Sequence, residues 1–324
     1  MTKNFFYKEC ICCSNQERQI ISTVGRNFTK LTTVMCLGCG LIHSHPIPSK
    51  KELDEFYKLD YRKKYKLTYK PQMRHTIRYA KGCFETVKEL FTYLDYDRGN
   101  NKTFLDIGSG SGEILYFAKK MGFDVLGIEP NNGYAEFTKI DLNLNVINST
   151  LEKTDFNNQK FDVINLNQVL EHLPNPLETL SKLKDLLNFN GILILTVPDI
   201  ESKLHSPNTQ FHYAHIYNYN HLTLKKLFDK IGLQILNPQT TSTRIFSKKT
   251  NFPDNSIIDF NFKKNFEHIS KIIYENNYKK HYMSLIPYLR FIRKCYQYPR
   301  EVLISLFYRK HIDVLNMIFI KYKD

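Results

Sequence analysis

The sequence has little of what marks an exported or membrane-spanning protein. Its first residues, MTKNFFYKEC, contain no long apolar core, so we expect no signal peptide. The apolar runs Val302–Tyr308 and Val314–Ile320 are far too short to cross a bilayer. These absences favour a cytoplasmic protein, and its seven cysteines are therefore not expected to form a disulfide framework.

Acidic residues are also scarce relative to basic ones: 46 Lys and Arg stand against 32 Asp and Glu, which gives a formal net charge of +14. The basic residues are spread along the chain rather than gathered in one stripe. We therefore do not expect a nucleic-acid partner, and RNA or an anionic membrane surface stays the alternative. A chain of 324 residues that is 42% hydrophobic can hold one full α/β domain with smaller additions.

What the sequence does contain is a glycine-rich turn between a strand and a helix. Residues 103–112 read TFLDIGSGSG, an apolar run followed by glycines at 108, 110 and 112. The apolar spacing of Glu113–Met121 predicts a helix directly after it. Because glycine has no Cβ, we expect a ligand to lie against backbone N–H groups of this turn, at the start of the helix.

Two acids distinguish this turn from a dinucleotide site, as does its G-x-G-x-G spacing. Asp106 lies inside the strand end, where its charge favours a cationic ligand over a pyrophosphate. The next predicted strand, Phe123–Glu129, ends in Glu129, whose carboxylate is suited to accept both hydroxyls of a ribose.

Four cysteines near the start have the spacing of a zinc site. They form two C-x-x-C pairs about two dozen residues apart: Cys10, Cys13, Cys36 and Cys39. Four thiolates close a tetrahedral Zn²⁺ site, so we expect a structural zinc ion. Cys12 is an alternative ligand, and reduced cysteines in a small core are the alternative to a metal. We interpret His43 and His45 as solvated loop residues, and Ile20–Val24 and Leu31–Met35 as strands.

Together these motifs resemble a known family. The segments LDIGSGSG and GIEP, then FDVI, VLEHL and NP, resemble the class I S-adenosylmethionine-dependent methyltransferases. The C-x-x-C-G pattern followed by P-x-P and a helix is similar to the zinc-ribbon leader of bacterial sugar and surface-polysaccharide methyltransferases. The acceptor we expect is a small molecule or glycan. The segment after the ribbon is basic, with Lys63, Lys64 and Lys66, and we interpret it as a solvated face; an acceptor that carries phosphate is the alternative.

The resemblance implies an α/β fold: a Rossmann-like, seven-stranded methyltransferase sheet with an N-terminal zinc ribbon and a C-terminal helical extension. We expect a ribbon over 1–48, a helical connector over 49–99, the methyltransferase domain over 100–250 and a basic helical extension over 251–324. Within the extension, Ile257–Tyr282 and Leu285–Phe319 are predicted helices. We favour packing of this extension on its own catalytic domain, with peripheral contact to the inner face of an anionic membrane or a partner subunit as alternatives.

The family's site residues carry over to positions that match its motifs. For S-adenosylmethionine the resemblance implies the following residues: Asp106, Gly108, Gly110, Gly112, Glu129, Leu151, Glu152, Asn167 and Gln168. Leu151 and Glu152 would border the adenine, and Asn167 and Gln168 the methionine part. An ordinary surface loop is the alternative for the first pair.

For catalysis the resemblance implies His215, Glu171 and His172. The loop Ile200–Asn220 would cover the acceptor as a lid, with His215 facing it. The acid that usually precedes this histidine is replaced by Ala214. Glu171 and His172 border the acceptor pocket or only cap the helix that starts near Pro176. His221 is predicted to cap the helix Leu222–Ile231.

These expectations point to methyl transfer from S-adenosylmethionine to a sugar-containing acceptor, a nucleotide sugar or a surface glycan, with oxygen as the favoured nucleophile. The alternatives are an RNA methyltransferase and a non-catalytic scaffold of the same fold. No D/N-P-P-Y/F motif follows the fourth strand, where Asn167–Leu170 stand instead, so methylation of a base nitrogen is disfavoured.

Overall fold

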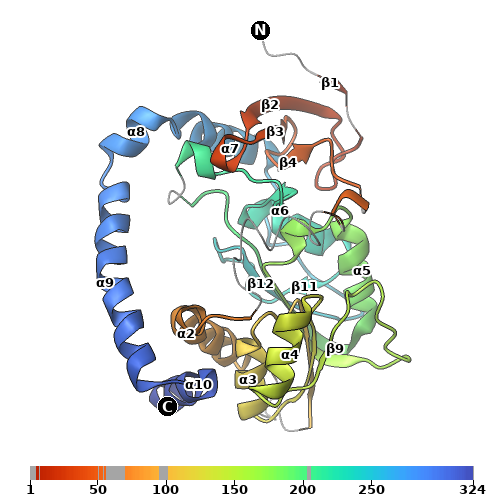
Figure 1. Cartoon of the computed structure of the whole chain (residues 1–324). Helices are drawn as coiled ribbons and strands as arrows, with labels where there is room; N and C mark the ends of the chain where they lie inside the picture. Colours follow the sequence, from red (N-terminus) through yellow and green to blue (C-terminus); the bar gives the residue numbers. More distant parts are fainter. Residues whose placement is uncertain are drawn as a thin grey trace. The chain divides into compact units, whose positions relative to one another are not determined.

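Figure 1 shows the computed structural model, which describes residues 5–6, 8–49, 51–53, 55, 70–94, 101–202 and 206–323. The chain divides into two compact units, which we describe one at a time. The first unit consists of Met1–Tyr61, Gln168–Lys184 and Leu195–Arg293, and the second of Arg62–Asn167, Asp185–Ile194 and Lys294–Asp324. The basic residues Lys63, Lys64 and Lys66 lie outside the described residues.

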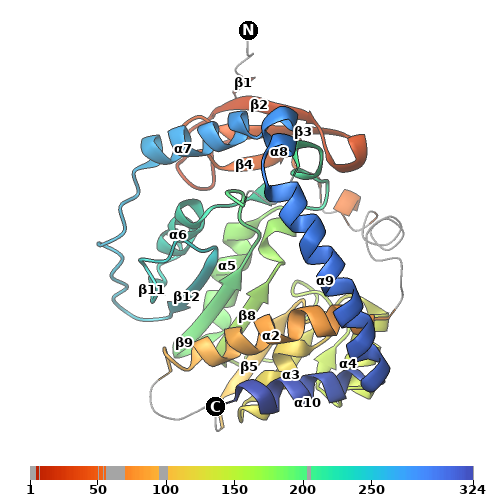
Figure 2. The ribbon, with the colours of Figure 1, turned by 90° about the vertical axis from the view of Figure 1, so that its left-hand side faces the viewer.

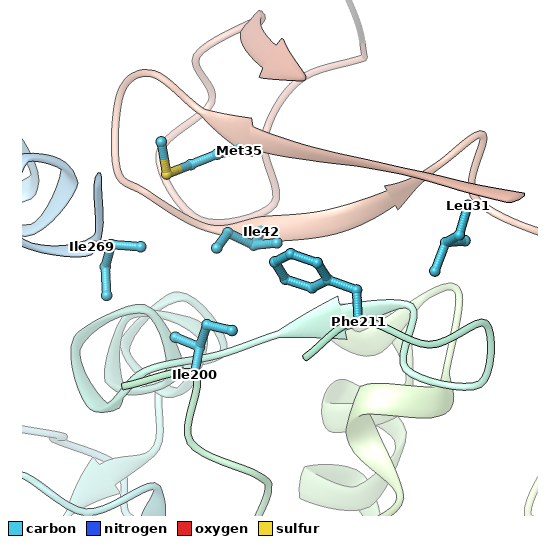
Figure 3. Close-up of a cluster of buried hydrophobic side chains, with 6 residues drawn as sticks. All are labelled: Leu31, Met35, Ile42, Ile200, Phe211 and Ile269. Carbon is cyan, nitrogen blue, oxygen red and sulfur yellow. The ribbon is translucent and has the colours of Figure 1, made fainter. Parts of the chain in front are cut away.

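The first unit contains a five-stranded antiparallel sheet. Its strands are β1 (Phe5–Phe6), β2 (Glu17–Val24), β3 (Lys30–Cys36), β4 (Ile42–His45) and β10 (Tyr217–Asn218), in the order β1-β2-β3-β4-β10. The two strands predicted in the ribbon are confirmed as β2 and β3. An apolar cluster joins the sheet to later parts of the unit, as Figure 3 shows; it comprises Leu31, Met35, Ile42, Ile200, Phe211 and Ile269.

Two expectations for this region are wrong. His43 and His45 lie on strand β4 rather than in a solvated loop, and His43 is buried because the strand has neighbours on both sides. The loop predicted over Ile200–Asn220 is not irregular throughout. Its end forms β10, where Tyr217 pairs with His43, so the ribbon sheet holds the last residues of this loop.

The second sheet has seven strands, as the family resemblance implies. They are β5 (Thr103–Ile107), β6 (Asp124–Ile128), β7 (Val146–Ile147), β8 (Phe161–Asn167), β9 (Leu187–Thr196), β11 (Gln234–Ile235) and β12 (Arg244–Lys248). Their order is β11-β12-β9-β8-β5-β6-β7. Strands β6, β5 and β8 are parallel, β11 and β12 antiparallel, so the sheet is mixed. The parallel strands are rich in apolar residues, and most of these are buried, as is typical of strands covered on both faces.

Helices follow the strands in the order that the sequence predicts. They are α2 (Met73–Leu90), α3 (Glu113–Lys120), α4 (Asn132–Ile140), α5 (Pro176–Leu186) and α6 (His221–Lys230). One cap differs from the expectation. The side chain of Asn220 accepts from the backbone N–H of Thr223, so Asn220 and not His221 caps α6. Asparagine is the better cap because its short side chain reaches this N–H group.

The extension forms four helices: α7 (Phe262–Glu275), α8 (Tyr278–Met283), α9 (Ile286–Phe307) and α10 (His311–Tyr322). Within the second unit, α10 packs on α2 and α3, with the rings of Phe84 and Phe319 6.2 Å apart (Figure 2). Within the first unit, Ile269 of α7 joins the ribbon cluster. In the described part of the chain no helix is long and apolar enough to span a membrane.

Candidate functional site

The glycine turn at the end of β5 has the geometry that glycine permits. Gly108, Gly110 and Gly112 have φ angles of +70°, +53° and +79°, a region that residues with a Cβ rarely adopt. A Cβ on Gly112 would lie 2.6 Å from Cγ2 of Thr138 in α4, whereas one on Gly110 would meet no atom closer than 3.9 Å. Gly112 is therefore needed for packing, and Gly110 leaves open space.

Several backbone N–H groups of this turn are bonded within the protein. Those of Gly108 and Ser109 donate to the carbonyl of Ile128, and that of Gly112 donates to the carbonyl of Ser109. The N–H of Gly110 donates to the carboxylate of Glu129 at 2.8 Å. These hydrogen bonds hold the turn against the end of β6. The turn therefore offers a ligand open space beside Gly110 as well as hydrogen-bond donors.

Three buried carboxylates gather in this part of the second unit: Asp106, Glu113 and Glu129. Asp106 is 3% exposed, and burial raises its pKa to about 7. The amide of Asn165, which donates to Asp106 at 2.7 Å, opposes this shift, whereas the charges of Glu129 and Glu113 add to it. Glu129 is held by the N–H groups of Gly110 and Asn131. Such a cluster favours a cationic ligand, because a positive charge relieves both desolvation and mutual repulsion.

Sequence reasoning missed Glu113 and Asn165. Glu113 is the first residue of α3 and accepts from the hydroxyls of Thr76 and Ser111. An acid directly after a glycine turn, in the first turn of a helix, is a recognisable signal. Asn165 is buried on β8 and bonds Asp106 across the strand pair, a contact that only the register β5–β8 reveals.

The other residues predicted to bind the cofactor are placed as follows. Leu151 is buried and Glu152 is exposed, both just after β7. Asn167 is the last residue of β8. Gln168 begins the next segment of the first unit with a φ angle of +57°, and its N–H donates to the carbonyl of Thr196. A glutamine in this sparsely populated conformation indicates a backbone path set by its surroundings.

In the first unit the structure brings together the three predicted catalytic residues. Nε2 of His172 lies 3.6 Å and Nε2 of His215 lies 3.9 Å from Oε1 of Glu171. Nδ1 of His172 is 2.6 Å from the carbonyl oxygen of Ala214, so this nitrogen donates and leaves Nε2 as the acceptor of a neutral ring. The ring of His212 lies 3.7 Å from that of His215, centroid to centroid. Ala214 replaces the acid usual in the family, and Glu171 supplies a carboxylate to His215 from another segment.

Glu171 is the buried carboxyl group of this cluster. It is 1% exposed, and burial raises its pKa to about 8. Within the described residues neither of its oxygens has a hydrogen-bond partner. A lone negative charge is unfavourable there, so the carboxyl group of Glu171 retains its proton near neutral pH. The arrangement therefore places two imidazole rings beside a neutral carboxyl group.

The four predicted zinc ligands also lie together, and Cys12 is not among them. One ligand atom from each of Cys10, Cys13, Cys36 and Cys39 lies within 4.8 Å of the others, and the closest sulfur pairs are 3.5 and 3.7 Å apart. Tetrahedral zinc with Zn–S bonds of about 2.3 Å requires sulfurs about 3.8 Å apart, so the site fits zinc. The thiol of Cys12 instead points to the carbonyl of Thr223 at 3.9 Å.

A buried cation supports this cysteine cluster. Arg18 is 2% exposed, and its guanidinium donates to Sγ of Cys36 at 3.5 Å. It also donates to the carbonyl oxygens of Asn15 and Glu17, and to Nε2 of His43. Four thiolates around Zn²⁺ carry a net charge of −2, and Arg18 compensates part of it. Sequence reasoning missed this arginine, because one basic residue in a strand has no distinctive pattern.

Comparison with known proteins agrees with this geometry. The family model described as "Methyltransferase domain" matches residues 73–237, half of the chain. A ubiquinone biosynthesis O-methyltransferase from Haemophilus ducreyi is 29% identical over 39% of this chain and 60% of its own length. One from Histophilus somni is 31% identical over 29% of this chain and 44% of its own length. The chain thus spans less than two thirds of these relatives, and their names concern ubiquinone rather than sugars.

Solved structures of similar fold include a magnesium protoporphyrin IX methyltransferase from Synechocystis PCC 6803 with bound S-adenosylmethionine. It is 17% identical, with a TM-score of 0.44, over 61% of this chain and 97% of its own. A 1,6-didemethyltoxoflavin N1-methyltransferase from Burkholderia thailandensis is 15% identical, with a TM-score of 0.44, over 65% of this chain and 96% of its own. On the strength of the family model, the chain belongs to the family of proteins that contain a methyltransferase domain.

Proposed function

We propose that the chain transfers a methyl group from S-adenosylmethionine to a hydroxyl oxygen of a sugar-containing acceptor, a nucleotide sugar or a surface glycan. The observation that carries this proposal is the cluster of buried carboxylates, Asp106, Glu113 and Glu129. The sulfonium of S-adenosylmethionine is a cation, which these carboxylates favour. Zinc held by the four cysteines is structural in this account, because four sulfur ligands leave no open position.

The choice of oxygen as acceptor rests on the histidine cluster. When bound, S-adenosylmethionine supplies an electrophilic methyl group. A hydroxyl that attacks this methyl group must lose its proton as the new O–C bond forms, and histidine is suited to take that proton near neutral pH. We assign this role to His215. Glu171 lies 3.9 Å from Nε2 of His215, and His172 adds a second nitrogen beside the same carboxyl group.

The same proposal assigns further residues to the contact with S-adenosylmethionine, beyond the three carboxylates. Gly110 leaves room beside the carboxylates, Leu151 and Glu152 border the adenine, and Asn167 and Gln168 the methionine part. Leu151 is buried and supplies an apolar contact, while Glu152 is exposed and supplies a polar one.

The identity of the acceptor is the finer part of the proposal. The cysteine ribbon before the methyltransferase domain supports a nucleotide sugar or surface glycan. The names of the curated relatives support a second candidate, a hydroxyl on an intermediate of ubiquinone biosynthesis. Both candidates are O-methylations, so both need the same proton acceptor.

The test is a methylation assay with radiolabelled S-adenosylmethionine and two acceptor panels, nucleotide sugars and polyprenylated catechols. We expect label in the sugar panel, a loss of at least a hundredfold in His215→Ala, and unchanged cofactor binding by that variant. His268→Ala is the matched control, because His268 is exposed and lies outside the cluster. Label in the catechol panel alone would overturn the sugar acceptor, and full activity of His215→Ala would overturn the assignment of the base.

A further inference from the structure

The ribbon is hydrogen-bonded to the chain on both sides of His215. Before His215, the backbone N–H of Arg26, in the turn between β2 and β3, donates to the carbonyl of Phe211 at 2.6 Å. After His215, the N–H of Ser44 in β4 donates to the carbonyl of Ile216 at 2.8 Å. His215 therefore lies in a short stretch of chain whose two ends are both bonded to the ribbon.

Buried apolar side chains join the same stretch, residues 211–218, to the ribbon; we call it the His215 segment. Phe211 is 5% exposed and belongs to the apolar cluster that contains Leu31 of β3 and Ile42 of β4 (Figure 3). Backbone hydrogen bonds and buried side chains thus act together, and the ribbon determines where the His215 segment lies.

The cysteine cluster lies at the turn between the two strands that hold this segment. Cys36 is the last residue of β3, and its N–H donates to the carbonyl of Leu41, just before β4. Arg18 donates to Sγ of Cys36 and to Nε2 of His43, and so connects a metal ligand to the residue that pairs with Tyr217. Zinc held by the cysteines would fix this turn and the strand on which the His215 segment pairs.

On its other side the His215 segment contacts residues that follow β8. Nδ1 of His172 lies 2.6 Å from the carbonyl oxygen of Ala214, and Nε2 of His215 lies 3.9 Å from Oε1 of Glu171. The histidine cluster therefore combines two separate parts of the first unit, the segment held by the ribbon and the residues after β8. A shift of about 1 Å in a reacting group can lower a rate about a hundredfold, so the position of this segment matters for catalysis.

We propose that the zinc-bound ribbon positions the base: metal at the four cysteines holds His215 beside Glu171 and His172, and loss of the metal displaces it. The proposal rests on the function proposed above, in which His215 takes the proton of the acceptor. The three carboxylates assigned to the cofactor belong to the other unit. Loss of zinc should therefore slow methyl transfer and leave the binding of S-adenosylmethionine unchanged.

The first test is hydrogen–deuterium exchange of the full chain, measured by mass spectrometry with zinc bound and after its removal by a chelator. We expect peptides of the ribbon and of the His215 segment to exchange faster together, by about tenfold or more, while peptides of α5 and β5 stay protected. Added zinc should restore the protection of both. The measurement needs no methyl acceptor, so its outcome is independent of the proposed function.

Two exchange patterns would overturn the proposal. Loss of protection in the ribbon alone would show that the His215 segment keeps its place without the metal. Loss of protection in α5 and β5 as well would show that zinc stabilises the whole chain rather than the position of this segment.

A second test perturbs the contact without touching a metal ligand. Leu31→Ala changes a ribbon residue that packs in the cluster with Phe211, and Leu183→Ala, a buried leucine of α5 outside that cluster, is the matched control. We expect Leu31→Ala to retain zinc and to speed exchange in the His215 segment by about tenfold, and Leu183→Ala to leave that segment unchanged. Equal exchange of the segment in the two variants would contradict the proposal.

The third test compares turnover with cofactor binding. In Leu31→Ala, kcat with the nucleotide-sugar panel should fall by about tenfold or more, because the base is displaced. Calorimetry should give the same dissociation constant for S-adenosylmethionine as in the unmodified chain, within about twofold. Unchanged turnover, or weaker cofactor binding that accounts for the whole loss, would overturn the proposal. Absence of cofactor binding by the unmodified chain would instead overturn the proposed function, and the exchange measurements would still decide whether the ribbon positions His215.

Discussion

Asp106 links the burial of a single carboxyl group to the pH dependence of stability. Its pKa is about 7 in the folded protein and about 4 in an unfolded chain. Between these values the folded state retains a proton that the unfolded state has lost, so stability falls as the pH rises from about 4 to about 7 and is constant above. We expect Asp106→Asn to remove this decrease, which is at most about 4 kcal/mol.

The measurement is urea unfolding of the ligand-free protein at pH 4.5, 6.0 and 7.5. The difference in unfolding free energy between Asp106→Asn and the unmodified chain should grow with pH in favour of the variant. Asp124→Asn, which changes an exposed aspartate at the start of β6, serves as the control. A difference that does not vary with pH would contradict the assigned shift.

Arg18 is expected to slow the loss of zinc from the cysteine cluster. Hydrogen bonds to charged groups contribute about 1.5–3 kcal/mol, so Arg18→Met should release zinc to a chromogenic chelator at least tenfold faster. Arg18→Lys keeps the charge but cannot donate all the hydrogen bonds of the guanidinium. Its rate of zinc release should lie between those of the unmodified chain and Arg18→Met. Equal release rates for all three proteins would show that the contact of Arg18 with Cys36 does not protect the metal.

For individual residues, the sequence predicts which side chains belong to a site better than it predicts which side chains they contact. The zinc-site prediction is confirmed in its residues, since the four cysteines lie together: Cys10, Cys13, Cys36 and Cys39. This cluster was predictable because two C-x-x-C pairs have few other interpretations. The carboxylate beside His215 could not be predicted, since Ala214 occupies the position where the family has its acid. Glu171 takes that place in space, and only the fold brings the two segments together.

Among the elements, the turn between β5 and α3 gives the clearest contrast between two glycines. Gly112→Ala would combine a φ angle of +79° with a Cβ 2.6 Å from Thr138, and should destabilise the protein by about 1–3 kcal/mol. Gly82→Ala, inside α2 with no atom within 4 Å of the new Cβ, should stabilise it by about 0.5–1 kcal/mol. Denaturant unfolding of both variants is the measurement, and a change of the same sign in both would contradict the structure.

The helices and strands of the methyltransferase domain follow the sequence closely because each has a strong local signal. Glycine turns, apolar runs and acids at strand ends predict the boundaries of β5, α3 and β6 to within about two residues. The short strand β10 has no such signal. It exists because Tyr217 pairs with His43, a partner far away in the sequence, and so it was predicted as loop. The same pairing buries His43, which local sequence suggested was solvated.

At the scale of the whole molecule, the helices of the C-terminal extension, residues 251–324, differ in how they pack. Its helix α10 packs on α2 and α3 through Phe319 and other apolar residues, whereas α9 keeps an apolar face exposed. The sequence showed that this segment is helical and basic, but not which of its helices packs. The ion pair between Arg78 of α2 and Glu301 of α9 could not be predicted either, because neither residue has a distinctive sequence pattern around it.

The proposed methyl transfer depends on one binding event: the buried carboxylates beside the glycine turn bind a cationic sulfur nucleoside. Isothermal titration calorimetry of the zinc-loaded chain with S-adenosylmethionine tests it most directly. We expect one site per chain with a dissociation constant in the micromolar range, and at least tenfold weaker binding by Asp106→Asn, with Asp124→Asn unchanged. Absence of binding heat in the folded, zinc-loaded protein would contradict the account.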